Sequence, residues 1–407
     1  MIALVAEPAE VAVIAAAVAK SPLATFDLEF LAQDRLVPTL CLVQVSWLEM
    51  PTLDVPVQAI VATPPEVRLI DPLAVDVRPL FDVLGAHPLV VVHAARQDLG
   101  IVASRFGITM PAIADTQIMA AFAGIGEQIG LAALGNDLLG LALGKEQQWT
   151  DWAKRPLSPA QLAYADSDVR HLPALYAKLA TRLGPRLAWA LAESAVVAGD
   201  AAEAARVTPE MAWRAFGGMR GLDAAGLAAL QELAAWRMRT AIELDKPINW
   251  VLAERTVVEL AKSRPTTPDG IHKLKGITTF AKQRADAILA AIASAKPDQV
   301  APIGYLRPAS SRAQRWSEIL LAIAQLVSEQ TGVATRLLAT RSDAEEFARA
   351  VDEGGLDAAR TLPALATWRR EVLGELWTSW LEGRAVLAGD AAAPSGIALL
   401  PRGILAP

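Results

Sequence analysis

The sequence predicts an α/β domain with a mixed sheet, followed by two smaller all-helical domains. Three observations lead to this prediction. Strand-like and helix-like segments alternate only up to about residue 190. The rest of the chain has helical periodicity alone, and a segment with three prolines and one glycine divides it at residues 296–311. A chain of 407 residues is also too long for one ordinary domain.

The first domain is expected to span residues 1–195. Apolar residues at helical spacing predict a helix over residues 6–20, and another helix includes residues 80–84. After the last predicted strand, at 88–93, helices alone follow up to about residue 182. Strand-like runs interleaved with helices are typical of a mixed rather than a purely parallel sheet. The predicted strands are residues 23–30, 39–47, 67–70 and 88–93.

The helical part of the chain divides into two domains. Residues 198–207 are small and mildly acidic and are expected to form a connector to a helical domain at 206–295. After the proline-containing linker, a second helical domain is expected at 312–387. Residues 388–407 are rich in Ala, Pro and Gly and predict a flexible tail.

Composition excludes several classes of protein. A single cysteine, Cys41, cannot build a disulfide framework or a Cys-rich zinc site, and its place in an apolar run predicts burial in the core. The N-terminus lacks a basic region, and no run of about 18 uncharged apolar residues is present, so neither a signal peptide nor a membrane span is expected. A cytoplasmic location fits these observations. A monomer is expected, although composition does not determine the oligomeric state.

Charge is distributed unevenly along the chain, which has a net charge of −6. Residues 1–205 hold 13 Lys and Arg against 22 Asp and Glu, whereas residues 206–290 hold 13 against 9. Acidic residues therefore gather where a carboxylate metal site could lie, and basic residues gather in a segment that could contact phosphates. Ordinary variation between domains is the alternative explanation.

The first chemical signal is an Asp-x-Glu pair in the first predicted strand. Side chains alternate along a strand, so Asp27 and Glu29 point to one face while Phe26, Leu28 and Phe30 point to the core. Two adjacent carboxylates repel each other, and a hard divalent cation relieves the repulsion. Alone, the pair is equally compatible with a solvated strand face.

Two further acidic positions follow. Asp98 lies in the first turn of a helix after the hydrophobic strand that ends at His93, where the helix dipole alone could explain it. Ser158 and Gln161 predict a capping box that fixes the phase of the next helix. Tyr164 and Asp168 then share one face of that helix, whereas Asp166 points away from them and is expected to be exposed.

The order Asp-x-Glu, Asp, Tyr-x-x-x-Asp resembles the DEDD exonuclease superfamily, and the tyrosine places the sequence in its tyrosine subgroup. Neighbouring segments strengthen a resemblance to the ribonuclease D family. These segments are Asp71-Pro72-Leu73, His93 to Leu99, Asp115-Thr116 and Asp151 to Leu157. The resemblance implies an α/β exonuclease domain with a ribonuclease H-like mixed sheet flanked by helices.

The resemblance extends into both helical domains. The segments 233–239, 244–247 and 274–277 look like an HRDC domain, and residues 337–343 with 368–371 look like a second, divergent copy. The family pattern departs at Leu28, where threonine is usual, and after Phe30, where the common arginines are missing. Leu28 lies on the core face, so the departure there is not expected to affect metal binding.

The resemblance also implies roles for five catalytic residues. Asp27, Glu29 and Asp168 are expected to hold one divalent metal ion, Mg²⁺ or Mn²⁺. Asp27 is expected to bind a second ion as well, which Asp98 supports directly or through a water molecule. Tyr164 is expected to orient the attacking water. Two such ions clamp the attacking and leaving oxygens of a phosphoryl displacement. The implied partner is RNA with a free 3′ end, such as a tRNA precursor.

Candidates for substrate contact are weighed against structural roles. His93 contacts substrate or makes a structural hydrogen bond, and Lys154 and Arg155 contact phosphate or shape their loop. In the first HRDC-like domain, basic side chains could grip the RNA backbone or simply form a solvated helical face. These basic residues are Lys246, Lys273, Lys275, Lys282 and Arg284.

The sequence leaves three functions open. The leading one is a 3′–5′ exoribonuclease that trims structured RNA and releases nucleoside 5′-monophosphates. A DNA 3′–5′ exonuclease would use the same catalytic residues, because the chemistry does not need the 2′-hydroxyl. A nucleic-acid-binding protein with a decayed site is the third possibility, although all five expected residues are present.

Overall fold

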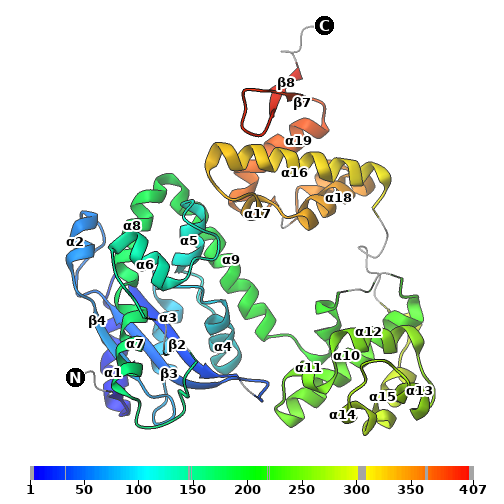
Figure 1. Cartoon of the computed structure of the whole chain (residues 1–407), viewed down its shortest axis with the longest axis horizontal. Coiled ribbons are helices and arrows are strands. Elements are labelled where there is room, and N and C mark those ends of the chain that lie inside the picture. Colours follow the sequence, from blue (N-terminus) through cyan, green and yellow to red (C-terminus); the bar gives the residue numbers. More distant parts are fainter. Residues whose placement is uncertain are drawn as a thin grey trace.

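Residues 4–205 form a sheet domain that is covered by helices on both faces, and two helical domains follow it (Figure 1). This description rests on a computed structural model. The residues that it describes are 4–32, 34–144, 147, 149–217, 219, 221–300, 309–362 and 365–402. Residues 301–308 of the expected linker and 403–407 of the expected tail lie outside them.

The sheet has six strands in the order β1-β4-β3-β2-β5-β6. β2 runs antiparallel to β3 and parallel to β5, so the sheet is mixed, as the sequence predicts. The strands are β1 (Leu4–Val5), β2 (Ala24–Leu31), β3 (Thr39–Trp47), β4 (Glu66–Ile70), β5 (Val90–Val92) and β6 (Ile113–Asp115). The sequence predicted four of these and missed β1 and β6, which are two and three residues long.

Nine α-helices are described in this domain. The helices are α1 (Pro8–Val18), α2 (Val57–Ala62), α3 (Arg78–Ala86), α4 (Arg96–Phe106), α5 (Thr116–Phe122), α6 (Leu131–Leu139), α7 (Pro159–Arg170), α8 (Leu172–Leu183) and α9 (Leu187–Ala205). The expected connector at 198–207 is wrong, since α9 continues through it to Ala205. Its alanines favour helix.

Side chains alternate between two hydrophobic cores, one on each face of the sheet. Val90 and Val92 belong to the core under α1, α3 and α4, and Val91 belongs to the core under α5, α7 and α8. Phe26 and Leu28 lie in the first of these cores. Asp27 and Glu29 consequently point to the other face, toward α7.

The second domain packs short helices around one long helix. Its own hydrophobic core includes Leu230, Leu233 and Val257. Its α-helices are α10 (Ala224–Leu244), α11 (Ile248–Val251), α12 (Glu254–Ser263), α13 (Pro268–His272), α14 (Thr279–Lys282) and α15 (Ala285–Ala293).

The first α-helix of the third domain is also long. Its α-helices are α16 (Ser311–Thr331), α17 (Thr335–Leu338), α18 (Arg341–Ala359) and α19 (Glu375–Leu381), with a π-helical turn at Arg370–Gly374. β7 (Ala385–Gly389) and β8 (Ile397–Pro401) then pair as an antiparallel hairpin. The flexible tail expected from composition is therefore wrong for residues 388–402, where backbone pairing overrides the tail-like composition. Within the described part of the chain, no helix has the length and apolarity needed to cross a membrane.

Candidate active site

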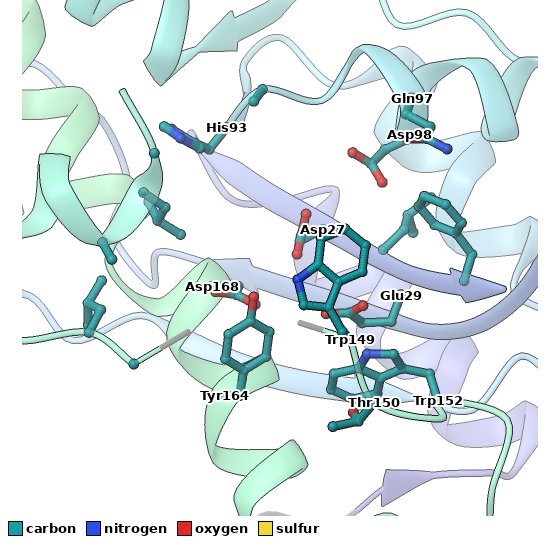
Figure 2. Close-up of a pocket in the computed structure, with 18 of the residues that line it drawn as sticks. Asp27, Glu29, His93, Gln97, Asp98, Trp149, Thr150, Trp152, Tyr164 and Asp168 are labelled. Carbon is teal, nitrogen blue, oxygen red and sulfur yellow. The ribbon is translucent and has the colours of Figure 1, made fainter. Parts of the chain in front are cut away.

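A cavity of about 610 Å³ opens between the sheet and α7, on the face to which Asp27 and Glu29 point (Figure 2). All five residues expected to be catalytic line it. They come from three elements that are far apart in the sequence. These residues are Asp27, Glu29, Asp98, Tyr164 and Asp168.

The strand β2 positions the first two carboxylates. Asp27 pairs with Gln44 of β3 across the sheet, and Phe26 and Leu28 anchor the opposite face, being 1% and 4% exposed. The register of β2 and β3 shifts between Glu29 and Phe30. The predicted alternation of carboxylates and core residues is confirmed, and the Leu28 side chain belongs to the core on the opposite face of the sheet.

The junction between β5 and α4 is built around a buried carboxylate, Asp115. Its oxygens accept hydrogen bonds from the backbone N–H groups of Ala94 at 2.9 Å, Ala95 at 3.1 Å and Gln117 at 2.9 Å. Ala94 adopts a φ of 54°, a left-handed conformation that a residue with a side chain rarely takes. This network fixes the start of α4 and thereby places Asp98, 8% exposed, in its first turn.

The helix α7 supplies the last two catalytic candidates. Its capping box is formed as predicted, with Ser158 accepting from the Gln161 N–H and Gln161 accepting in return. Tyr164 and Asp168 face the cavity (Figure 2). The expected exposure of Asp166 is wrong, because it is only 8% exposed and pairs with Arg170 at 2.6 Å. α7 lies against the sheet, so it buries more than one face.

Three of the carboxylates can share one cation. Asp27, Glu29 and Asp168 each offer an oxygen atom, and these atoms all lie within 4.8 Å of one another. In Figure 2, Asp27 lies between Asp168 and Asp98. The charge of Asp27 contributes to the raised pKa of Asp98. The described residues that line the cavity include no Lys or Arg.

The carboxyl groups are held in surroundings that disfavour their charge. Burial raises the pKa of Asp27 to about 7 and that of Asp168 to about 8. Burial and repulsion from the neighbouring carboxylates raise the pKa of Glu29 to about 9. Burial also raises the pKa of Asp98 well above its usual range. A divalent cation would compensate this concentration of negative charge, so the residues fit a hard metal ion.

The Tyr164 hydroxyl lies beside the Asp168 carboxylate (Figure 2). Burial raises the pKa of the phenol further above its usual range, and the nearby carboxylates add to the effect. The hydroxyl therefore stays protonated near neutral pH and remains a hydrogen-bond donor.

His93 and the loop cations have structural contacts. His93 lines the cavity, and its Nδ1 lies 2.9 Å from the Thr116 hydroxyl. Arg155 donates to both carboxylate oxygens of Asp71 at 2.6 Å and to the Cys41 carbonyl at 2.7 Å. These contacts support a role for Arg155 in shaping its loop rather than in binding phosphate. Lys154 is exposed and does not line the cavity.

The basic candidates of the second domain do not line the cavity. Four of them are exposed lysines, and Arg284 is half-buried with its guanidinium 3.7 Å from the centroid of the Phe280 ring. The lysines are Lys246, Lys273, Lys275 and Lys282. Cys41 is buried, as its apolar run predicts.

Sequence reasoning missed several residues of the site. Gln97, Gln117 and two tryptophans, Trp149 and Trp152, also line the cavity. The signal for Trp149 was a single large aromatic in the polar run from Gln147 to Thr150. Nothing in that run indicates which side chains turn toward the carboxylates.

Comparisons with known proteins agree with this geometry. A family described as 3′-5′ exonuclease matches residues 2–184, and the HRDC domain matches residues 226–299. The chain is 34% identical to ribonuclease D of Acidiphilium cryptum over 91% of this chain and 90% of that protein. This chain belongs to the ribonuclease D family. It is a 3′–5′ exoribonuclease with a mixed-sheet nuclease domain and a helical HRDC domain.

Other ribonuclease D proteins give the same result. That of Gluconacetobacter diazotrophicus is 32% identical over 91% of this chain and 90% of its own length. The crystal structure of Escherichia coli RNase D, described as an exoribonuclease involved in structured RNA processing, superposes with a TM-score of 0.77 at 27% identity. The match covers 94% of this chain and 99% of that chain, so the likeness includes the third domain.

Proposed function

We propose that this exoribonuclease trims the 3′ ends of structured RNA, such as tRNA precursors, and releases nucleoside 5′-monophosphates. The observation that carries the proposal is the meeting of Asp27, Glu29 and Asp168 within 4.8 Å in a cavity that Asp98 and Tyr164 also line. A similarly folded RNase D acts in structured RNA processing. The proposal follows that relative for the class of substrate.

We assign metal-binding roles to four carboxylates. Asp27, Glu29 and Asp168 hold one divalent cation, and Asp27 and Asp98 hold a second one. When bound, two such ions stabilise the charge on the attacking and leaving oxygens of phosphodiester hydrolysis. The donors are carboxylate oxygens, which suit Mg²⁺ or Mn²⁺ better than a softer metal.

Tyr164 has a positioning role in the proposal. Its protonated hydroxyl points into the cavity beside Asp168, where it can hold a water molecule by hydrogen bonding. The spacing of Tyr164 four residues before Asp168 supports membership of the tyrosine subgroup. His93 keeps a supporting role, holding the end of β5 through Thr116.

The third domain is proposed to be a second, divergent HRDC-like domain. The first α-helix of each helical domain, α10 or α16, has 21 residues, and its first turn is capped by Asp223 or Ser310. In both, a four-residue helix follows, α11 or α17. The boundaries at 206–295 and 312–387 stay predictions, as do the monomeric state and the cytoplasmic location.

The exposed lysines of the HRDC domain are proposed to contact the RNA backbone. This domain carries the basic excess of the chain, whereas the nuclease domain is acidic. Lysine contacts to phosphate are independent of sequence, which suits RNA bodies that differ between substrates.

The test is digestion of a 5′-labelled, 3′-extended tRNA with Mg²⁺, Mn²⁺ or chelator. We expect a ladder that shortens from the 3′ end, needs the metal, and is about 10³-fold slower or more with Asp27→Asn, because a ligand of the reacting centre is lost. The exposed Asp54→Asn is the matched control.

The alternatives give different results in the same experiment. Equal degradation of a DNA strand of the same sequence would favour a nuclease without preference for RNA. RNA binding without turnover by the wild-type protein, in the presence of either metal, would contradict the proposed catalysis. Calorimetric titration of Mn²⁺ into wild type and Asp27→Asn tests the metal site independently of activity.

A further inference from the structure

Trp149 is a large aromatic side chain that folding leaves almost wholly in water. It is 90% exposed, yet it lines the same cavity as Asp27 and Glu29. In Figure 2 its indole ring lies in front of these carboxylates. Tryptophan usually buries its ring area on folding, so an exposed indole at a reacting centre is available to a ligand.

The loop backbone beside Trp149 is held by the residue that follows it. The N–H and hydroxyl groups of Thr150 donate to the Gln147 carbonyl at 3.1 and 2.9 Å. Gln161, which belongs to the capping box of α7, donates to the Thr150 hydroxyl at 3.1 Å. The backbone beside Trp149 is thus tied to the helix that carries Tyr164.

A second tryptophan of the same loop has a different environment. Trp152 is 2% exposed and packs against Tyr164 with ring centroids 6.2 Å apart. Its indole N–H is buried and has no hydrogen-bond partner among the described residues, although the residue lines the cavity. Trp152 packs the loop against α7, whereas Trp149 buries little of its ring against the described residues.

The proposed function explains what Trp149 can contact. A scissile phosphodiester held at the carboxylates places the attached base one ribose away, within a cavity large enough for a nucleotide-sized ligand. We propose that Trp149 is the platform on which a base at the 3′ end of the RNA stacks. This proposal rests on the exoribonuclease function and adds a specificity-determining residue to it.

The charge of the cavity supports stacking as a source of affinity. Its described lining includes no Lys or Arg, so none of the described lining residues contributes a positively charged Lys or Arg side chain to phosphate binding. Stacking on an aromatic ring tolerates any base, because every base has a π-face. A base inside a duplex is already stacked on its neighbours. The platform therefore selects RNA whose 3′ end is single-stranded, whatever its sequence.

The first experiment measures steady-state kinetics of Trp149→Ala and Trp149→Phe on a short single-stranded RNA. Loss of one stack should raise KM about tenfold in Trp149→Ala, and Phe should restore most of the affinity. kcat should be retained, because the stack forms equally in the ground state and the transition state. Val13→Ala, at a side chain 70% exposed on α1, is the control.

The second experiment removes the base instead of the ring. RNA with an abasic site at the terminal or the penultimate nucleotide should bind as poorly to the wild type as intact RNA binds to Trp149→Ala. The two changes together should cost no more than either alone, and the position that shows this non-additivity identifies the stacked base.

Two results would separate the proposal from the function on which it rests. If the wild type trims RNA but KM is unchanged in Trp149→Ala, or if neither abasic position is non-additive with it, the stacking platform is wrong and the exoribonuclease stands. If the wild type does not shorten RNA from its 3′ end, the proposed function itself fails. A tryptophan needed only for folding would lower the thermal stability of Trp149→Ala, which is not expected for so exposed a side chain.

Discussion

The two helical domains contact the nuclease domain in different ways. The third domain contributes Trp368 to a core shared with the nuclease, where it packs on Phe122 and Trp189 at 4.9 and 5.8 Å between ring centroids. Trp368 and Arg369 also donate to Glu193 of α9 at 3.1 and 2.8 Å. The Arg369 and Glu193 side chains are only 16% and 12% exposed.

The HRDC domain has its own core and a smaller, exposed contact. Arg35, in the loop between β2 and β3, approaches Asp245 at 3.7 Å, with side chains 58% and 49% exposed. The Leu36 N–H donates to Asp245 at 3.2 Å. The third domain therefore shares a hydrophobic core with the nuclease, whereas the HRDC domain is attached by exposed polar contacts and by the half-buried Leu36, which packs against its core.

The largest expected effect is that of breaking the buried ion pair. Glu193→Ala leaves Arg369 buried without its partner and removes the acceptor of the Trp368 indole, so the free energy of unfolding should fall by about 3–5 kcal/mol. Chemical denaturation followed by tryptophan fluorescence measures the change.

An exposed ion pair between the same two domains is the matched control. Arg336 contacts Glu127 at 2.7 Å with side chains 51% and 42% exposed, so Glu127→Ala should cost less than about 1 kcal/mol. Equal losses in the two variants would show that burial of the Glu193 pair does not hold the third domain.

The second largest expected effect is the change in the stability of the metal-free nuclease domain with pH. Each raised carboxyl pKa, about 7 for Asp27, 8 for Asp168 and 9 for Glu29, makes the folded nuclease hold more protons than the unfolded chain between about pH 4 and 9. Its free energy of unfolding should therefore fall as pH rises through this window.

Calorimetric scans at several pH values test whether the stability of the nuclease falls as pH rises. The nuclease transition should move to lower temperature as pH rises, and Asp27→Asn should reduce the movement. Added Mg²⁺ should oppose it, because metal binding favours the ionised carboxylates. A transition whose temperature rises from pH 5 to 9 in metal-free protein would contradict the raised pKa values.

The smallest effect is expected at the HRDC contact. Asp245→Asn removes the charge that faces Arg35 and keeps a residue type that tolerates the left-handed backbone at this position, where φ is 47°. Because both side chains are exposed, stability should change by less than about 1 kcal/mol. Small-angle scattering should detect a larger radius of gyration while the unfolding transitions stay in place. A large loss of stability would mean that the HRDC domain is docked as firmly as the third domain.

Much of the nuclease fold could be predicted because its signals are local. The alternation around Asp27 and Glu29 and the Ser158–Gln161 capping box depend on neighbouring residues, and both were predicted correctly. The strand β6 could not be predicted, because three residues carry no periodic pattern and the strand exists by pairing with β5. The prediction that Asp166 is exposed was wrong, because its burial depends on how α7 lies against the sheet.

By itself, the sequence determined the residue types of the site and the faces on which they lie, since these follow from the periods of strands and helices. Only the tertiary structure decided which residues meet. It brings Asp168 to Asp27 across 141 positions of sequence, and it commits Arg155 to Asp71 and Cys41 rather than to phosphate. It also leaves Trp149 exposed beside the carboxylates while burying Trp152 three residues later. Such choices depend on long-range packing, which no local pattern records.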